Sequence, residues 1–376
     1  MSQDNFSWVN DLPQGVSNFL ELLNKNNSNF EYDFSIQGVT KQGEKLKLGF
    51  SCFALKLNYI IQSDLFTKKD YENWVKYINS YQVSYSNFPV NSYIDKNYLK
   101  YAKEFSFSKI TKNLLKSSVN LLLPNRYELL NVRIQNAIKA ESKQAISTIH
   151  QMGFTSCYSY SEFPNTEKKI RTYLDNLNWT YPWHAGAQFS ALCLFVSTQM
   201  TDEENMYKAK NFLKTFSTDL VDKETGFYFR GKQNNKQELI NGAMKMITGF
   251  SWLDTQIHYP EKIIDFCLNE KVSNEGCDIV DIVYVLFECS KQTDYRKGDI
   301  HKFLVSLIPV IHKHYYQDIG GFSYFLNQSQ THYYGVNVTT GQDAPDLHGT
   351  ILLVWAISLI LKVINYDYVD FKILKP

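Results

Sequence analysis

The chain has 376 residues, and its 39 Lys and Arg against 38 Asp and Glu leave a formal net charge of +1. This balance, without a long basic run, excludes the electrostatic footprint of a nucleic-acid-binding surface and a polybasic arm for an anionic membrane. The length exceeds the usual size of one hydrophobic core, yet closed barrels often remain single domains at such lengths. We therefore expect one domain spanning residues 1–376.

The N-terminal segment MSQDNFSWVNDLPQG lacks the basic-then-apolar pattern of a signal peptide. We find no apolar run of the ~18 residues that a transmembrane helix requires. The six cysteines are scattered and include no CxxC pair, which predicts neither disulfides nor a structural zinc site. These features predict a cytoplasmic protein that does not insert into membranes and that needs no metal and no cofactor.

Apolar residues recur at helical spacing along most of the chain. In the N-terminal part this periodicity predicts helices at Gly15–Lys25, Gly49–Gln62, Thr67–Ser80, Tyr98–Lys103, Ser108–Asn120 and Arg133–Met152. Further helices are predicted at Glu167–Asn176, His184–Thr198, Asp202–Ser217, Leu239–Leu253, Pro260–Asn269, Cys277–Cys289, Lys297–Tyr316 and Leu347–Ile364. Polar and apolar helices alternate with a repeat of roughly 50 residues, which is typical of an array of helical hairpins.

Residue chemistry at the helix starts supports these boundaries. Thr67 and Asp202 are typical N-cap residues, and Pro260 is favoured in a first helical turn. The segment Gly49–Gln62 has Lys56 as its only charge, so we expect it to be buried on most sides. The alternation therefore predicts buried inner helices and amphipathic outer helices.

The apolar helices share a second pattern, in which polar residues stand in or just before the first turn. Asp346-Leu347-His348-Gly349 leads into TILLVWAISLIL, and Trp183-His184 precedes AGAQFSALCLFV. Asn241 and Lys245 open MITGFSWL, while Asp278 and Asp281 lie at the start of the apolar segment IVYVLFEC. A polar cluster at the mouth of a buried helix is how a barrel of helices presents reactive groups to a central pocket.

Two links between an outer and an inner helix carry a Gly-Phe-aromatic motif: Lys223–Phe229 (KETGFYF) and Gln317–Phe325 (QDIGGFSYF). A short turn or strand that ends in an aromatic plug would fit both. The second link is followed by Pro-Asp-Leu-His-Gly-Thr and an apolar helix.

With these motifs the chain resembles the α/α-toroid superfamily. The GGF segment and the following helix are similar to the repeat of terpenoid cyclases and protein prenyltransferases, and the alternating hairpins are similar to six-hairpin glycosidases, sugar epimerases and polysaccharide lyases. The resemblance implies an all-α fold, an (α/α)6 or (α/α)7 toroid whose inner helices line a central cavity. It covers the region from Gly15 to Ile364.

The chain departs from the isoprenoid enzymes at two points. A class II terpene cyclase carries Asp-x-Asp-Asp, whereas this chain has Asp278-Ile279-Val280-Asp281. A protein prenyltransferase binds zinc through Asp, Cys and His. Cys277, Asp278 and His348 have these types, but neighbours on a helix point ~100° apart, so Cys277 and Asp278 are poorly placed to share a metal.

Five residues are our candidates for acid/base chemistry: His184, Asp278, Asp281, Asp346 and His348. Asp278 and Asp281 stand at i and i+3 on one face of an apolar helix, where unpaired carboxylates are costly unless they are solvated. We expect Asp281 and His348 to share a water-filled cavity, with His348 titrating near neutrality. The structural alternatives are that His184 caps and packs and that Asp346 and Asp278 cap their helices.

The candidates for substrate binding are mostly aromatic, since aromatic residues make up 15% of the chain and ring faces build the walls of sugar and hydrocarbon pockets. They are Trp179, Tyr181, Trp183, Asn241, Lys245, Tyr333 and Tyr334. Asn241 and Lys245 are spaced i and i+4, and a polar stripe on the exposed face of a helix would have the same spacing. Tyr333 and Tyr334 stand in the long loop Asn327–Asp343, which is either a lid or a surface loop. We expect His312 and His314 at the surface, near the end of an outer helix.

Two classes of enzyme fit these residues. The first acts on a carbohydrate or glycan, through hydrolysis, elimination or epimerisation by acid/base chemistry. The second is a terpenoid cyclase or prenyltransferase-like enzyme with an aromatic cavity. We favour carbohydrate chemistry, with a glycan or small molecule as the partner. The carboxylates, histidines, Asn241 and Lys245 at the helix starts would make the pocket more polar and more hydrated than a hydrocarbon substrate needs. A third alternative is a non-catalytic toroid that binds a glycan or a protein.

Overall fold

The computed structural model describes residues 6–24, 30–63, 66–103 and 129–376. Helices hold 58% of the described residues and strands 6%, so the predicted all-α class is confirmed. The helix expected at residues 108–120 lies outside the described residues.

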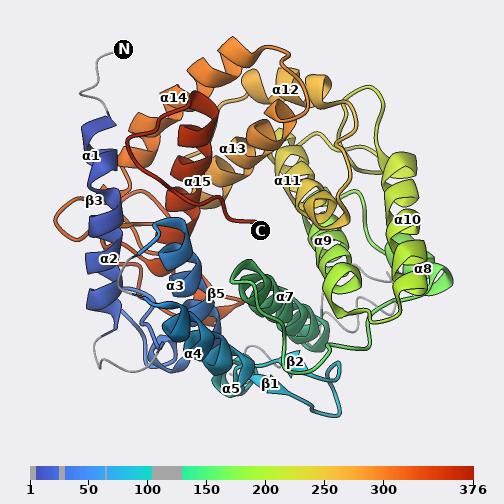
Figure 1. Cartoon of the computed structure of the whole chain (residues 1–376), viewed down its shortest axis with the longest axis horizontal. Helices are drawn as coiled ribbons and strands as arrows, with labels where there is room; N and C mark the ends of the chain where they lie inside the picture. The colour runs from blue at the N-terminus through green and yellow to red at the C-terminus, as the bar shows by residue number, and fades with distance from the viewer. Residues whose placement is uncertain (1–5, 25–29, 64–65, 104–128) are drawn as a thin grey trace.

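Within the described part of the chain, six helices pack against one another in a cycle (Figure 1). They are α3 (Leu48–Ile60), α7 (Leu130–Gln151), α9 (Pro182–Gln199), α11 (Lys236–Leu253), α13 (Gly276–Ser290) and α15 (Leu347–Ile364). Each helix contacts the next one in this order, and α15 returns to contact α3. We call these six the inner helices.

The other long helices pack on the outside of this cycle (Figure 1). They are α2 (Leu12–Leu23), α4 (Lys68–Asn79), α8 (Glu167–Asp175), α10 (Glu203–Leu220), α12 (Pro260–Leu268) and α14 (Lys297–His312), with the shorter α1 (Ser7–Asn10) and α5 (Lys96–Lys103). Nearly all residues of α3 are buried, whereas in α4 only Trp74, Val75 and Ile78 are. The expected division into inner and amphipathic outer helices therefore holds for this pair.

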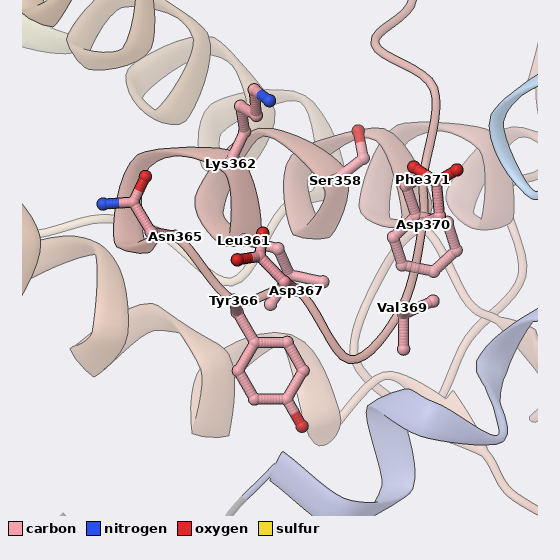
Figure 2. Close-up of a pocket in the computed structure, with 9 residues that line it drawn as sticks. All are labelled: Ser358, Leu361, Lys362, Asn365, Tyr366, Asp367, Val369, Asp370 and Phe371. Carbon is pink, nitrogen blue, oxygen red and sulfur yellow. The ribbon is translucent and has the colours of Figure 1, made fainter.

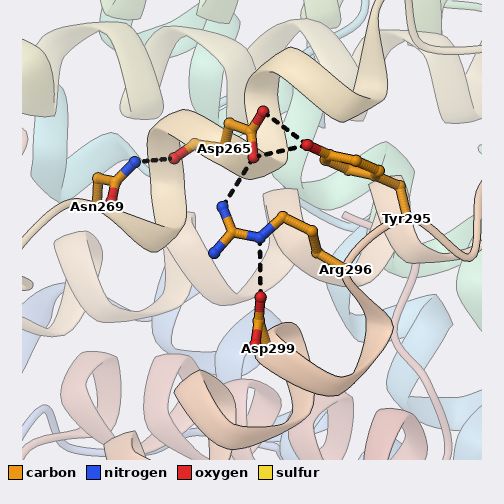
Figure 3. A network of polar contacts seen from close by, with 5 residues as sticks. All are labelled: Asp265, Asn269, Tyr295, Arg296 and Asp299. Carbon is orange, nitrogen blue, oxygen red and sulfur yellow. Dashed lines mark hydrogen bonds and ion pairs between the residues drawn. The ribbon is translucent and has the colours of Figure 1, made fainter.

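Helix caps mark the starts of outer helices, and ion pairs at the surface join two of these helices. Thr67 forms a capping box with Asp70, and Asp202 accepts a hydrogen bond from the backbone of Asn205. Between α12 and α14, the guanidinium of Arg296 donates to Asp265 at 2.8 Å and to Asp299 at 2.9 Å (Figure 3). Exposed ion pairs of this kind contribute little to stability, so they orient the corner more than they stabilise it.

Three of the inner helices, α11, α13 and α15, have their N-terminal ends on the same side. The amide of Asn241 near the start of α11 donates to Asp278 near the start of α13. At the start of α13, the backbone N–H of Gly276 donates to the carbonyl of Tyr324, whose backbone also packs on Gly349 of α15. Polar residues in the first turns of these helices are therefore brought to one end of the cycle.

The last residues of the chain cross the opposite end (Figure 1). The N–H of Lys372 donates to the carbonyl of Ile60 at 2.9 Å, and the N–H of Lys375 donates to the side chain of Gln151 at 2.7 Å. The indole of Trp252 donates to the carbonyl of Pro376 at 2.8 Å. This segment therefore covers the C-terminal ends of α3, α7 and α11.

The strands form three two-stranded antiparallel hairpins in the described residues. They are β1 (Gln82–Val83) with β2 (Ser92–Tyr93), β3 (Tyr315–Tyr316) with β4 (Gly321–Phe322), and β5 (His332–Tyr333) with β6 (Val336–Asn337). In the two Gly-Phe links, Phe322 is buried in β4, and Phe227 is buried beside an isolated bridge between Val221 and Tyr228. The expected short turn or strand with a buried aromatic ring is therefore found in both links, as a turn with a single bridge in the first and as a strand in the second.

The last outer helix is shorter than predicted. It ends at His312 because the chain turns into β3, whereas the periodicity predicted a helix to Tyr316. The surface position expected for His314 is wrong: its ring is fully buried, with Nδ1 2.9 Å from the carbonyl oxygen of Ser323.

The helix α15 is long and apolar enough to cross a membrane, with a mean hydropathy of 2.1, so the expectation that the chain has no apolar run of this length is wrong. Length and composition are weak evidence for a span, because core helices pass the same test, and 72% of this segment is buried inside the fold. It packs against α3, α13 and α14, which accounts for its apolar composition.

Trp355 provides a test of this packing. Its side chain is 4% exposed, and its ring centroid lies 5.2 Å from that of Tyr284 in α13. Trp355→Ala should lower the free energy of unfolding by ~3–5 kcal/mol, because it removes ring contacts and leaves a cavity. Chemical denaturation would measure the change, with Lys362→Ala on the exposed side of the same helix as the control. Equal unfolding midpoints for the two variants would contradict the burial of Trp355.

Candidate functional site

Asp281 is the most unusual carboxylate on the inner helices. It lies in the second turn of α13 with 2% of its surface exposed, and its Oδ2 accepts no hydrogen bond from the described residues. Burial raises its pKa to about 7, against the opposing charge of Lys245, and the nearby Asp278 adds to the rise. A carboxyl group with such a pKa can both give and take a proton at neutral pH.

Asp278 is held by neighbours on both sides. Its carboxylate accepts hydrogen bonds from the amide of Asn241 at 3.2 Å and from the hydroxyl of Ser273 at 2.6 Å. It does not cap α13, which has no side-chain cap. The capping alternative for Asp278 is therefore wrong, and the buried Asn241 links α11 to α13 instead of lying on a surface stripe.

The ring of His348 is stacked between two aromatic rings. Its centroid lies 5.0 Å from that of Phe53, at an interplanar angle of 15°, and 5.3 Å from that of Tyr324, at 18°. The Nδ1 atom is 2.6 Å from Oε1 of Gln330. An amide oxygen is an acceptor, so Nδ1 carries the proton and Nε2 is left as an acceptor.

The protonation state of His348 differs from the prediction. Burial, aided by the positive charge of Lys245, lowers its pKa to about 4. The expectation that His348 titrates near neutrality is therefore wrong. At pH 7 the ring is neutral, and it can accept a hydrogen bond but cannot serve as a charged acid.

Lys245 connects Asp281 and His348. It is half-buried on α11, and its charge acts on Asp281 of α13 and on His348 of α15. The main packing partners of α11 are α9, α13 and α10, not α15. The charge of Lys245 therefore reaches residues on two other inner helices, α13 and α15.

A second contact joins the same region. The backbone N–H of Gly276, at the start of α13, donates to the carbonyl of Tyr324 at 3.1 Å. Since Tyr324 also stacks on His348, residues of α13, the link before α15 and α15 itself form a continuous cluster. We call Asp278, Asp281, Tyr324, Lys245 and His348 the inner cluster.

Three ionisable residues near this cluster were not among the sequence candidates. Glu141 of α7 is 4% exposed and accepts hydrogen bonds from the hydroxyl of Tyr333 at 2.9 and 3.0 Å. Burial raises its pKa to about 8, although the hydrogen bond from Tyr333 opposes the rise. Burial and the charges of Lys245 and Lys56 lower the pKa of Lys143 to about 7, and burial lowers that of Lys56 to about 8.

Of these three residues, the sequence pattern indicated the burial of Lys56 but not that of Glu141 or Lys143. Lys56 was visible as the single charge of an apolar segment, but the mixed polarity of α7 hid the inward position of Glu141 and Lys143. Their position follows from long-range packing. Gly49 of α3 shows this, because a Cβ there would lie 1.9 Å from the Tyr333 hydroxyl and 2.6 Å from Oε1 of Glu141.

Tyr333 and Tyr334 reach the interior from the hairpin β5–β6. Tyr334 and Gly335 occupy its turn, both with positive φ (45° and 81°), as a two-residue type I′ turn requires. The side chain of Tyr333 is buried against Phe50 and Phe53. This part of the predicted lid or surface loop is therefore a hairpin whose aromatic tip packs into the fold.

Asp346 caps the N-terminus of α15, which was the structural alternative to a catalytic role. One carboxylate oxygen accepts from the N–H of Gly349 at 2.8 Å and so caps α15. The other accepts from the backbone N–H groups of Tyr324 at 2.8 Å and Gln330 at 3.0 Å. Burial still raises its pKa to about 6, despite these bonds. Because the backbone occupies both oxygens, Asp346 orients the site rather than facing a ligand.

The candidates around the start of α9 are separate from the inner cluster. Trp179 is buried and its indole donates to the carbonyl of Leu174, while Tyr181 is 54% exposed. His184 is exposed beside the half-buried ring of Trp183. No contact among the described residues joins His184 to Asp281 or His348, and these last two are linked through the charge of Lys245, so the convergence of the three residues stays a prediction.

Two pockets among the described residues lie away from the inner cluster. One of about 80 Å³ sits at the end of α15 and is lined by that helix and by residues 365–371 (Figure 2). Another, of about 190 Å³, lies between α7, α8 and α9 and is lined by Lys139, Phe163 and Tyr173, among others. Neither contains a sequence candidate. Among the described residues, no group of three or more His, Cys, Asp or Glu could hold a metal ion.

Comparisons of this chain with protein-family models, with curated proteins and with solved structures gave no match.

The buried Glu141 makes stability depend on pH. Its pKa rises from 4.5 to about 8 on folding, so between these values the folded state holds a proton that the unfolded state has lost. The free energy of unfolding should therefore fall with rising pH in this window, by up to about 1.4 kcal/mol per pH unit from this group. Glu141→Gln should flatten the slope, as measured by denaturation at pH 5, 6, 7 and 8.

Glu203→Gln, an exposed change on α10, serves as the control and should keep the slope of the parent. A Glu141→Gln protein with the same slope as the parent would show that Glu141 is ionised in the folded state.

Proposed function

We propose that the inner helices form an (α/α)6 toroid around a cavity and that the inner cluster lines this cavity. The closed cycle of contacts from α3 to α15 supports this arrangement. So do the ionisable residues on the inner sides of α7, α11, α13 and α15, because charged groups in a dry core would be strongly disfavoured. A water-filled cavity explains why Lys143, Lys245 and His348 are half-buried instead of fully buried.

We propose further that the protein is an enzyme that acts on a saccharide by acid/base chemistry in this cavity. The observation that carries the proposal is Asp281: a buried carboxyl group with a free oxygen and a pKa of about 7, beside a second carboxylate. Pairs of carboxyl groups in different environments are what enzymes use to cleave or rearrange sugars. Asp281 gives a proton to a leaving or ring oxygen, and its carboxylate then takes a proton back.

The neighbouring residues have distinct roles in this proposal. Asp278, oriented by Asn241 and Ser273, is the second carboxylate. His348, neutral and fixed between Phe53 and Tyr324, accepts a hydrogen bond at Nε2 from a sugar hydroxyl. Hydrolysis, elimination and epimerisation all use groups of this kind.

An isoprenoid cyclase or transferase remains the alternative, because rings such as Phe53, Tyr324 and Tyr333 are suited to a hydrocarbon. The three lysines near the cluster argue against it. A carbocation in the same cavity would be repelled by Lys56, Lys143 and Lys245, whereas a neutral or anionic sugar would not.

A panel of oligosaccharides tests the proposal, with products followed by mass spectrometry. On a saccharide that is converted, Asp281→Asn should lower kcat by about 100-fold or more, as expected for a lost general acid or base. The unfolding midpoint should not fall, because the amide removes a buried ionisable group. Asp299→Asn, at the surface corner of Figure 3, should keep full activity.

Conversion that survives Asp281→Asn unchanged would contradict the role of Asp281. Consumption of a prenyl diphosphate, with no saccharide converted, would favour the isoprenoid alternative. Saccharide binding without any conversion would favour a non-catalytic binding protein.

The pH profile gives a second test. If Asp281 acts as the acid, kcat/KM should fall as the pH rises through about 7, because the acid form is lost. His348 should add no limb near neutrality, since its pKa of about 4 keeps it neutral there. A His348→Gln variant that removes a limb near pH 6.5 would overturn this assignment.

A further inference from the structure

The pocket of about 190 Å³ between α7, α8 and α9 is lined largely by rings. The ring centroids of Tyr160 and Phe195 lie 4.5 Å apart, and those of Phe163 and Phe195 lie 5.7 Å apart. Leu192 and Pro164 add to the apolar lining. A dry cavity of about 150 Å³ holds one benzene molecule. The pocket therefore has room for one six-membered ring with a small substituent.

The polar groups of this pocket are bonded to one another. The ammonium group of Lys139 donates to the hydroxyl of Tyr173 at 3.1 Å and to Oε1 of Gln188 at 3.2 Å. The hydroxyl of Tyr173 donates to the same amide oxygen at 2.6 Å. The three side chains come from α7, α8 and α9, so their hydrogen bonds hold the ammonium group in place between three helices.

One donor of this group is left over. An ammonium group has three N–H donors, and those of Lys139 have two acceptors in the described residues, both of them neutral. The exposed lysines Lys208 and Lys236, by contrast, each form an ion pair with a glutamate. Burial lowers the pKa of Lys139, and a carboxylate beside it would offset that effect.

The surroundings of the pocket carry more positive than negative charge. A wider hollow of about 670 Å³ adjoins it, shares Tyr173 with it and is lined by the exposed Lys168 and Lys169. Against these two lysines and Lys139 stands one carboxylate of the lining, Glu162, which is exposed. This balance favours the approach of an anion.

A saccharide does not suit this pocket. One free donor and walls made of rings would leave most sugar hydroxyls without hydrogen-bond partners, and burying such groups is costly. The lining suits a molecule with one anionic acceptor and an otherwise apolar body.

We propose that this pocket binds a small carboxylate that carries one apolar six-membered ring. The carboxylate accepts from Nζ of Lys139, and the ring packs against Phe163 and Phe195. The pocket shares no lining residue with the inner cluster, so this site is separate from the saccharide chemistry proposed above.

Titration of the full chain, followed through the line widths of the probe in proton NMR, tests the proposal. The probes are benzoate, benzamide, which has the same shape without the charge, and glucuronate, which has the charge on a hydroxylated ring. Benzoate should bind. Benzamide should bind at least about ten-fold more weakly because it cannot form the charge-assisted hydrogen bond. Glucuronate should bind at least about ten-fold more weakly because its hydroxyls lose their water.

Four variants locate the ligand. Lys139→Met keeps the aliphatic stem and removes the charge, so it should weaken benzoate by about ten-fold or more and abolish the preference over benzamide. Phe163→Ala removes part of the ring wall and should weaken both probes. Glu162→Gln should not weaken benzoate, because it removes a negative charge. Lys302→Met, an exposed change on α14, is the matched control and should leave binding unchanged.

The outcomes are distinct. Equal binding of benzoate and benzamide to the parent, or benzoate binding that is unchanged in Lys139→Met and Phe163→Ala, would overturn the proposal. Should Lys139→Met fail to fold, the half-buried Phe163 decides through its own variant whether benzoate occupies this pocket. Glucuronate that binds as tightly as benzoate would contradict an apolar ligand, and its loss in Asp281→Asn would assign it to the inner cluster. Failure of all three probes to bind would overturn this site and leave saccharide chemistry untouched, because that proposal is tested by turnover.

Discussion

The closure of the inner cycle depends on one buried carboxylate. Asp346 accepts three backbone hydrogen bonds, from Gly349, Tyr324 and Gln330, and so joins α15, the link before it and the hairpin region in one place. A buried carboxylate is stable only when its lone pairs are satisfied in this way. The stacking of His348 between Tyr324 and Phe53 depends on the same arrangement, because Asp346 fixes the backbone on which both His348 and Tyr324 stand. The position of the inner cluster is therefore a consequence of a helix cap.

The electrostatics of the interior reverse what the residue types alone would indicate. An unperturbed histidine titrates near neutrality, and carboxylates are charged there. Here burial keeps His348 neutral, leaves Glu141 largely protonated and raises the pKa of Asp281 to about 7, while it lowers the pKa values of Lys56 and Lys143. In the proposed enzyme, the carboxyl group of Asp281 is the group that moves the proton, and His348 provides a fixed hydrogen-bonding surface.

Local sequence predicted the helices well because their signals are local. Caps such as Thr67 and Asp202, the proline at the start of α12 and the alternation of apolar and amphipathic segments are each encoded within a few residues. Asp281 could be found in the same way, as a carboxylate on an apolar helix. Glu141 and Lys143 could not be found in this way, because α7 has mixed polarity. The position of Glu141 is defined by Gly49 of α3 and by Tyr333, which lies 192 residues later in the chain and donates a hydrogen bond to Glu141. The lowered pKa of His348 likewise comes first from its burial in the folded chain and then from the charge of Lys245, which lies on another helix.

The contact between the first and last inner helices also has a kinetic meaning. At this seam the hydroxyl of Ser35 donates to the carbonyl of Pro345, a residue 310 positions later in the chain. Contacts between neighbouring hairpins, by contrast, close short loops, and the entropic demand of loop closure grows with loop length. The hairpins should therefore assemble in sequence and the seam should form last. Until then α15, the most apolar of the described helices, has one side uncovered, so an open ring is the species most exposed to self-association during folding.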